Sequence, residues 1–166
     1  MLTIRPIQEV PGMLEPARAL YQRAFPPQER IPFSMMTGDT SGTSEVFVFL
    51  REGTFAAFCC LLNNRDLSHI TYLAVEEKER DKGYGSEILR LIRAQKPGQR
   101  ILVDIEEPEE GTPNARQRLR RKAFYLRAGY QETAIRYTWR GEDYQILSCG
   151  GAVSEAEFWQ FWREIR

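Results

Sequence analysis

The sequence has little cysteine and histidine, carries no net charge and lacks a long apolar run. Its three cysteines, Cys59, Cys60 and Cys149, are an odd number without CxxC spacing, which argues against a disulfide framework and against a CxxC metal or redox site. The apolar run at residues 55–62 is far shorter than the roughly 20 residues that a membrane helix needs. Residues 1–10 lack the basic-then-apolar pattern of a signal peptide. We therefore expect a cytoplasmic protein with buried thiols, no metal site and no membrane contact.

The charge balance and length narrow the class further. Lys and Arg together number 23, as do Asp and Glu, so a globally basic nucleic-acid binder is not expected. The 166 residues, of which 42% are hydrophobic, suit a single globular domain over residues 1–166.

Hydrophobic periodicity predicts an α/β fold. We expect strands at residues 2–7, 45–51, 54–63, 67–75, 101–106, 131–139 and 143–149, and helices at 13–25, 28–36 (broken at Pro32), 83–94, 114–128 and 155–166. A strand meander followed by alternating strands and helices favours a mixed sheet with helices on both faces.

Turn and capping residues indicate where several of these strands and helices begin or end. Glu52-Gly53 and residues 140–142 are placed as hairpin turns, and Gly129 as the end of a helix. Ser154 and Glu157 have the spacing of a capping box that opens the last helix.

The last helix also carries a group of aromatic residues. Phe158, Trp162 and Ile165 are predicted to form its packing stripe. Trp159 and Phe161 are placed outside that stripe, where they would offer a homodimer contact.

The most informative segment runs from a predicted strand through a loop into a helix. It reads Arg80-Asp81-Lys82-Gly83-Tyr84-Gly85-Ser86. Glycines at a helix start let backbone N–H groups approach a phosphate, and Arg80 and Lys82 add positive charge. The segment predicts binding of a pyrophosphate-like anion; the alternative is that the glycines serve turn geometry alone.

A dinucleotide-binding turn is a rival interpretation, since Asp104 lies about 20 residues beyond the glycines. It is disfavoured because Ile88 occupies the third glycine position and residues 76–82 separate the strand from the glycines.

Two motifs resemble the GNAT superfamily of N-acetyltransferases. Arg80-x-x-Gly83-x-Gly85 is similar to the family's acetyl-CoA-binding motif, and residues 123–130, AFYLRAGY, are similar to a second family segment. The resemblance implies a mixed, mostly antiparallel sheet of about six to seven strands. It also implies acetyl-CoA as the acetyl donor, bound by residues 80–86 and by backbone groups of Leu73, Ala74 and Val75. An amine would then attack the thioester directly.

One position departs from the family pattern. Many members carry Asn seven residues before the tyrosine of the second motif, whereas this chain carries Arg118. Either Arg118 meets a coenzyme phosphate or it belongs to a solvated, charged helix face.

Acetyl transfer to an amine needs a base for the amine and an acid for the leaving thiolate. By the resemblance, Tyr125 is the acid. His69, the only histidine, matches a position that holds the general base in some members, and imidazole suits that role near neutral pH. Glu106, at the end of the next strand, is a competing base.

The acceptor is expected to be an amine of a small molecule or a protein. Glu29 falls where the family frames its acceptor pocket, and the acidic segment at residues 106–110 would attract a cationic amine. The alternative function is a non-catalytic acyl-CoA-binding sensor or scaffold of the same fold. Release of CoA in the presence of amines would distinguish the two.

Overall fold

A computed structural model describes residues 1–165 of the chain, which form two compact units. Unit 1 contains Met1–Asn63 and Ile70–Gln95, and unit 2 contains Asn64–His69 and the chain from Lys96 onward. The last residue of the predicted helix at 155–166 lies outside the described residues. Whether the chain acts as one domain stays a prediction.

The strands confirm the predicted mixed, mostly antiparallel sheet with helices. Within residues 1–165, seven strands follow the order β1-β2-β3-β4-β5-β7-β6, in which β1–β2, β2–β3, β5–β7 and β6–β7 are antiparallel pairs. The strands are β1 (Leu2–Pro6), β2 (Ser44–Arg51), β3 (Thr54–Asn64), β4 (Leu67–Val75), β5 (Arg100–Glu106), β6 (Gln131–Trp139) and β7 (Glu142–Cys149). The α-helices are α1 (Leu14–Ala24), α2 (Phe33–Thr37), α3 (Tyr84–Gln95), α4 (Ala115–Arg127) and α5 (Glu155–Glu164).

Both predicted hairpins are closed by two-residue turns. Glu52 and Gly53 have φ values of 50° and 81°, and Arg140 and Gly141 have 51° and 81°. Two successive positive φ values match the twist of antiparallel strands. The first turn is confirmed, but the second is one residue shorter than predicted, because Glu142 already begins β7.

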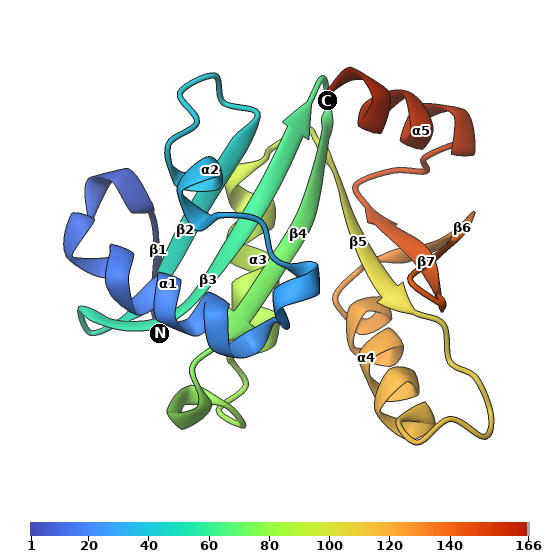
Figure 1. The fold of residues 1–166 in the computed structure, drawn as a ribbon, viewed down its shortest axis with the longest axis horizontal. Coiled ribbons are helices and arrows are strands. Elements are labelled where there is room, and N and C mark those ends of the chain that lie inside the picture. Colours follow the sequence, from blue (N-terminus) through green and yellow to red (C-terminus); the bar gives the residue numbers. More distant parts are fainter. Residues whose placement is uncertain (166) are drawn as a thin grey trace. The chain divides into compact units, whose positions relative to one another are not determined.

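Unit 1 packs helices on both faces of its strands, with α1 and α2 in front and α3 behind in Figure 1. Alternation along β2 directs Val46 and Val48 into the core shared with α1 and α2. On α3, Ile88 and Ile92 are buried. Glu87 of α3 accepts a hydrogen bond from the backbone N–H of Leu2 at 2.7 Å, which fixes the helix against β1.

In unit 2, α4 packs on β5 and β6, and α5 packs on β6. The packing stripe of α5 differs from the prediction, because Phe161 is 2% exposed and contacts the His69 ring. Phe161 lies only about 60° around the helix from Phe158 and so shares its face. Trp159, 39% exposed, is the remaining basis for the predicted homodimer contact.

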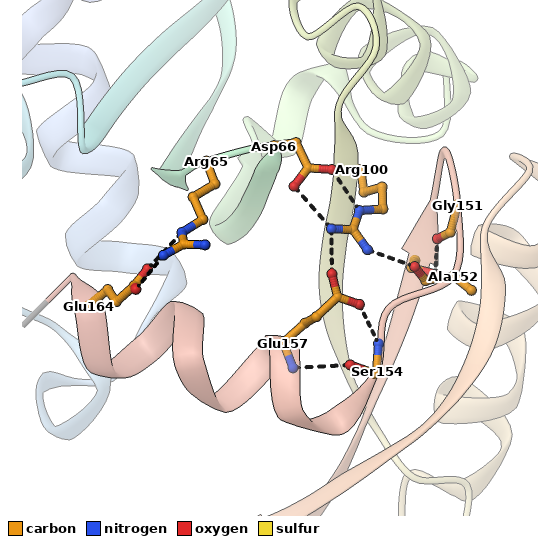
Figure 2. Close-up of polar contacts among 9 residues, drawn as sticks. Arg65, Asp66, Arg100, Gly151, Ala152, Ser154, Glu157 and Glu164 are labelled. Carbon is orange, nitrogen blue, oxygen red and sulfur yellow. Dashed lines mark hydrogen bonds and ion pairs between the residues drawn. The ribbon is translucent and has the colours of Figure 1, made fainter.

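A polar network joins the start of β5 to the start of α5 (Figure 2). Arg100 donates to the Asp66 carboxylate at 3.0 Å, to Glu157 at 2.7 Å and to the carbonyl of Ala152 at 2.8 Å. Glu157 also completes the predicted capping box with Ser154, which is confirmed. The network borders a cavity of about 120 Å³. The first turn of α5 is therefore held by one guanidinium.

Replacing Arg100 by methionine is expected to lower the free energy of unfolding by about 2 kcal/mol at pH 7, in the range for charged hydrogen bonds at a partly exposed site. The cause is that two carboxylates lose their shared cation. Urea denaturation measures the loss, with exposed Arg163 on α5, replaced by methionine, as the matched control. An equal loss in both variants would contradict this role.

The same network predicts a pH dependence. The hydrogen bond from Arg100 lowers the pKa of Glu157 from 4.5 to about 2. A lowered folded pKa means that this stabilisation is complete above pH 4.5 and is lost as the pH falls towards 2. The stability difference between wild type and Arg100→Met should therefore shrink over that interval.

All three cysteines are buried thiols, as predicted. Among the described helices, none has the length and apolar character needed to cross a membrane.

Candidate active site

The glycine loop of unit 1 leads from β4 into α3. Gly83 has a φ of 76°, and a Cβ built there would meet no atom within 4 Å. The residue is exposed, and the first N–H groups of α3 follow it without intrahelical acceptors. An open glycine before unsatisfied N–H groups gives an anion room to approach the backbone.

The charged residues of this loop differ in how they are held. Arg80 is exposed and donates from Nε to the carbonyl of Val75 at 3.2 Å, so its guanidinium stays at the end of β4. Lys82 instead forms an ion pair with Glu79 at 3.1 Å. Asp81, Tyr84, Gly85 and Ser86 complete the loop and the first turn of α3.

The end of β4 carries the three residues for which backbone contacts with the coenzyme are predicted. Ala74 is buried in the core of unit 1, while Leu73 and Val75 are half-buried. Their side chains hold no charge, so the strand end offers carbonyl and N–H groups alone.

The segment around Glu29 is fixed by two tyrosines of unit 1. Tyr72 of β4 donates to the Glu29 carbonyl at 2.5 Å, and the Tyr21 hydroxyl bonds both the N–H and the carbonyl of Ile31. Burial raises the pKa of Tyr72 well above its ordinary value, so the phenol remains a donor. The half-buried Glu29 side chain therefore sits on a rigid turn, η3 (Pro27–Glu29).

Tyr125 lies on α4 in unit 2. It is 4% exposed, and its ring contacts Phe124 at a centroid distance of 5.3 Å and Tyr130 at 5.4 Å. The N–H of Tyr130 also binds the carbonyl of Tyr125 at 3.1 Å, as the chain turns out of the helix. The ring position is therefore set by packing.

Glu106 closes β5, and its side chain is 38% exposed. Arg118 of α4 reaches it with an Nη2–Oε2 distance of 2.6 Å, and also binds Glu142 at 2.9 Å and the carbonyl of Glu107 at 3.2 Å. Arg118 is only 7% exposed, so the predicted solvated helix face is wrong at this position. Instead, Arg118 orients the Glu106 carboxylate.

His69 is 2% exposed and lies beneath the aromatic face of α5, with the Trp162 ring at 5.4 Å. Its Nε2 contacts Asp104, whose other carboxylate oxygen accepts a hydrogen bond from Tyr137. Its Nδ1 is buried with no hydrogen-bond partner within residues 1–165. If His69 takes a proton from the amine that accepts the acetyl group, the proton must therefore pass through Asp104, whose side chain is 25% exposed.

The structure thus gathers the predicted residues into two sets. The glycine loop, the β4 strand end and Glu29 belong to unit 1, and Tyr125, His69 and Glu106 belong to unit 2. Sequence reasoning missed two residues that contact members of these sets, Glu79 beside Lys82 and Asp104 beside His69, and a third, Tyr137, that contacts Asp104. The alternation of Asp104 with apolar neighbours on β5 was the available signal, because a carboxylate on such a strand needs a partner.

Solved structures with a similar fold include several acetyltransferases. A GNAT-family protein from Bacteroides thetaiotaomicron has a TM-score of 0.78 and 18% identity, covering 98% of this chain and 94% of the other. The ribosomal-protein-S18-alanine N-acetyltransferase from Escherichia coli has 0.64 and 19%, covering 93% and 96%. Mutant forms of the spermidine/spermine N-acetyltransferase from Vibrio cholerae have 0.63 and 12%, covering 89% and 93%. The chain therefore has the fold that these solved structures share.

The sequence identifies the family. Residues 42–132 match the family model of the acetyltransferase (GNAT) domain, and the chain belongs to that family. This stretch includes β4, the glycine loop, Tyr125 and Arg118. A search of curated proteins by sequence finds no match.

Proposed function

We propose that the protein is an acetyl-CoA-dependent N-acetyltransferase that transfers an acetyl group to a primary amine by direct attack on the thioester. The observation that carries the proposal is the open, glycine-led start of α3 within the region that matches the family.

The residues present fit the coenzyme's anionic part. The space at Gly83 and the N–H groups at the start of α3 suit a pyrophosphate, with Arg80 as the nearby exposed cation. Backbone groups of Leu73, Ala74 and Val75 are proposed to align the pantetheine arm. When bound, acetyl-CoA would supply the activated thioester.

The proton transfers are assigned to unit 2. Tyr125 is proposed to protonate the leaving sulfur, since its packed ring can hold the phenol in one place. Of the two base candidates, the contacts favour Glu106, because its carboxylate is exposed and oriented by Arg118. His69 would act only through Asp104, since Nε2 is engaged there and Nδ1 is enclosed.

The two base candidates predict different pH profiles. With Glu106 as base, Glu106→Gln should lower kcat/KM by about 100-fold or more, the usual effect of removing a general base. It should also remove the decline of kcat/KM at low pH, while His69→Ala keeps that decline. The profiles are measured from about pH 3.5 to about pH 9, because glutamate carboxyls ordinarily titrate at about 4.3.

Glu107→Gln is the matched control, because Glu107 is the next residue and is held by Arg136 at 2.5 Å. Its profile should match that of the wild type. The reverse pattern, with the low-pH decline lost in His69→Ala and retained in Glu106→Gln, would assign the base to His69 instead.

The acceptor is proposed to be a cationic amine of a small molecule or a protein. Named relatives of the fold act on a ribosomal-protein alanine and on spermidine and spermine, so the fold is compatible with both kinds. Exposed Glu109 and Glu110 leave negative charge on the loop after β5.

A screen of diverse amines for CoA release from acetyl-CoA tests the enzyme proposal. Release that depends on an added amine supports it. Stabilisation of the protein by CoA without release by any amine would favour the non-catalytic acyl-CoA-binding module.

A further inference from the structure

Glu79 is a buried carboxylate directly before the glycine loop. It is 1% exposed and ends the short turn η4 (Glu77–Glu79). Arg51, the last residue of β2, donates from Nε to both carboxylate oxygens at 3.0 and 3.1 Å and from Nη2 at 2.8 Å. Burying a charge is costly unless it is paired and hydrogen-bonded, and this pairing meets both conditions.

Lys82 is the second cation that binds the Glu79 carboxylate. Its ammonium reaches back over Asp81 to the Glu79 carboxylate at 3.1 Å. Glu79 therefore links the loop to Arg51 of β2 and also to Lys82 within the loop, and we call these three residues the clamp. Lys82 is engaged in the clamp, whereas the N–H groups at the start of α3 and the exposed Arg80 are the groups proposed to meet an external anion.

The backbone of the loop turns sharply where the ion pair closes it. Asp81 has a φ of 63° and Gly83 of 76°. Glycine and aspartate are among the residues that enter this left-handed region most readily, so the turn suits its sequence. The ion pair between Glu79 and Lys82 spans Asp81 and holds the two sides of this turn together.

We propose that Glu79 is a positioning residue for the anion-binding loop. Through Arg51 and Lys82, it holds residues 80–86 in the conformation that receives the pyrophosphate of the coenzyme. The inference rests on the proposed function for its ligand, and its geometry lies wholly within unit 1.

The Glu79 carboxylate stays negatively charged between pH 5 and pH 8. Hydrogen bonds from Arg51 lower the pKa of Glu79 to about 2, so the carboxylate is ionised throughout pH 5–8. Protonation of Glu79 therefore adds no pH dependence to coenzyme binding over that interval.

The test compares Glu79→Gln with Glu52→Gln by titration calorimetry with CoA. Glu52 also faces Arg51, at 4.0 Å, but is 88% exposed, so its variant removes a charge near Arg51 without opening the clamp. Glu79→Gln should weaken CoA binding about tenfold or more, because a misplaced loop loses several contacts together. Glu52→Gln should bind as the wild type does.

Kinetics separate positioning from a purely structural role. The KM for acetyl-CoA should rise in Glu79→Gln with the same factor as the CoA Kd, while kcat at saturation is retained. Measurements at 15 °C, with circular dichroism confirming the fold, keep lost stability out of the comparison. If Glu79→Gln unfolds, Arg51→Met removes the same clamp from the other side and carries the same expectation.

Hydrogen exchange distinguishes failure of this inference from failure of the proposed function. Without coenzyme, amides of residues 80–86 should exchange faster in Glu79→Gln than in wild type. Wild-type CoA affinity in a folded Glu79→Gln would overturn the inference and leave the function standing. If the wild type binds no CoA, the proposed function fails, and unchanged exchange would then overturn the clamp as well.

Discussion

Replacing Tyr125 by phenylalanine is expected to lower kcat by about 100-fold or more, while CoA binds with nearly unchanged affinity. The ring is held by its contacts with Phe124 and Tyr130, and phenylalanine retains those contacts. What disappears is the hydroxyl proton proposed for the leaving sulfur. Steady-state kinetics and CoA titration measure the two quantities on the same preparation.

Tyr130→Phe is the matched control. Tyr130 is also 4% exposed, and its ring meets that of Tyr125 at 70°, so its variant removes a second buried hydroxyl from the same cluster. It should retain kcat within a few-fold. A Tyr125→Phe enzyme with near-normal kcat, or an equal loss in both variants, would show that Tyr125 serves packing.

The features that were predictable from the sequence are those set by neighbouring residues. Ser154 and Glu157 lie three positions apart, and that spacing alone determines the capping box. Glu52-Gly53 between two apolar runs similarly determines a hairpin turn. The start of α3 after Gly83 follows from a glycine that opens an amphipathic pattern.

The features that were not predictable depend on partners distant in the sequence. His69 was predicted to face an acceptor, but the packing of α5 encloses it, and the sequence does not indicate which helix covers which strand. Glu79 and Arg51 are 28 residues apart. The sequence alone therefore does not show that they form a buried ion pair, and each is expected to be an exposed surface charge.

The ion-pair partners of Arg118 were likewise not predictable from the sequence. The sequence identifies it as unusual for the family but offers only a coenzyme phosphate or solvent as its partner. The structure supplies Glu106 and Glu142, from the end of one strand and the start of another. Three charged groups meet because β5 and β7 are paired, and pairing of non-consecutive strands is a tertiary property.

Replacing Gly83 by aspartate is expected to abolish the stabilisation of the protein by CoA. A ligand of the native state at 100 times its Kd stabilises the wild type by about 2.7 kcal/mol. The open space at Gly83 admits the new side chain, whose carboxylate would then lie where the coenzyme pyrophosphate is proposed to bind. The carboxylate and the pyrophosphate would repel each other at close range, and the new side chain would also occupy the space that the pyrophosphate needs.

Gly83→Asn is the matched control that separates the effect of the new negative charge from the effect of replacing glycine in the backbone. Gly83 has a φ of 76°, and aspartate and asparagine both tolerate that left-handed region better than other residues. The two variants therefore carry similar conformational strain and nearly the same volume, and differ in charge. Thermal denaturation with and without CoA should show a reduced shift for Gly83→Asn and none for Gly83→Asp. Stabilisation of both variants by CoA to the same extent as the wild type would mean that no phosphate approaches this loop, and the anion site would have to be sought elsewhere in the chain.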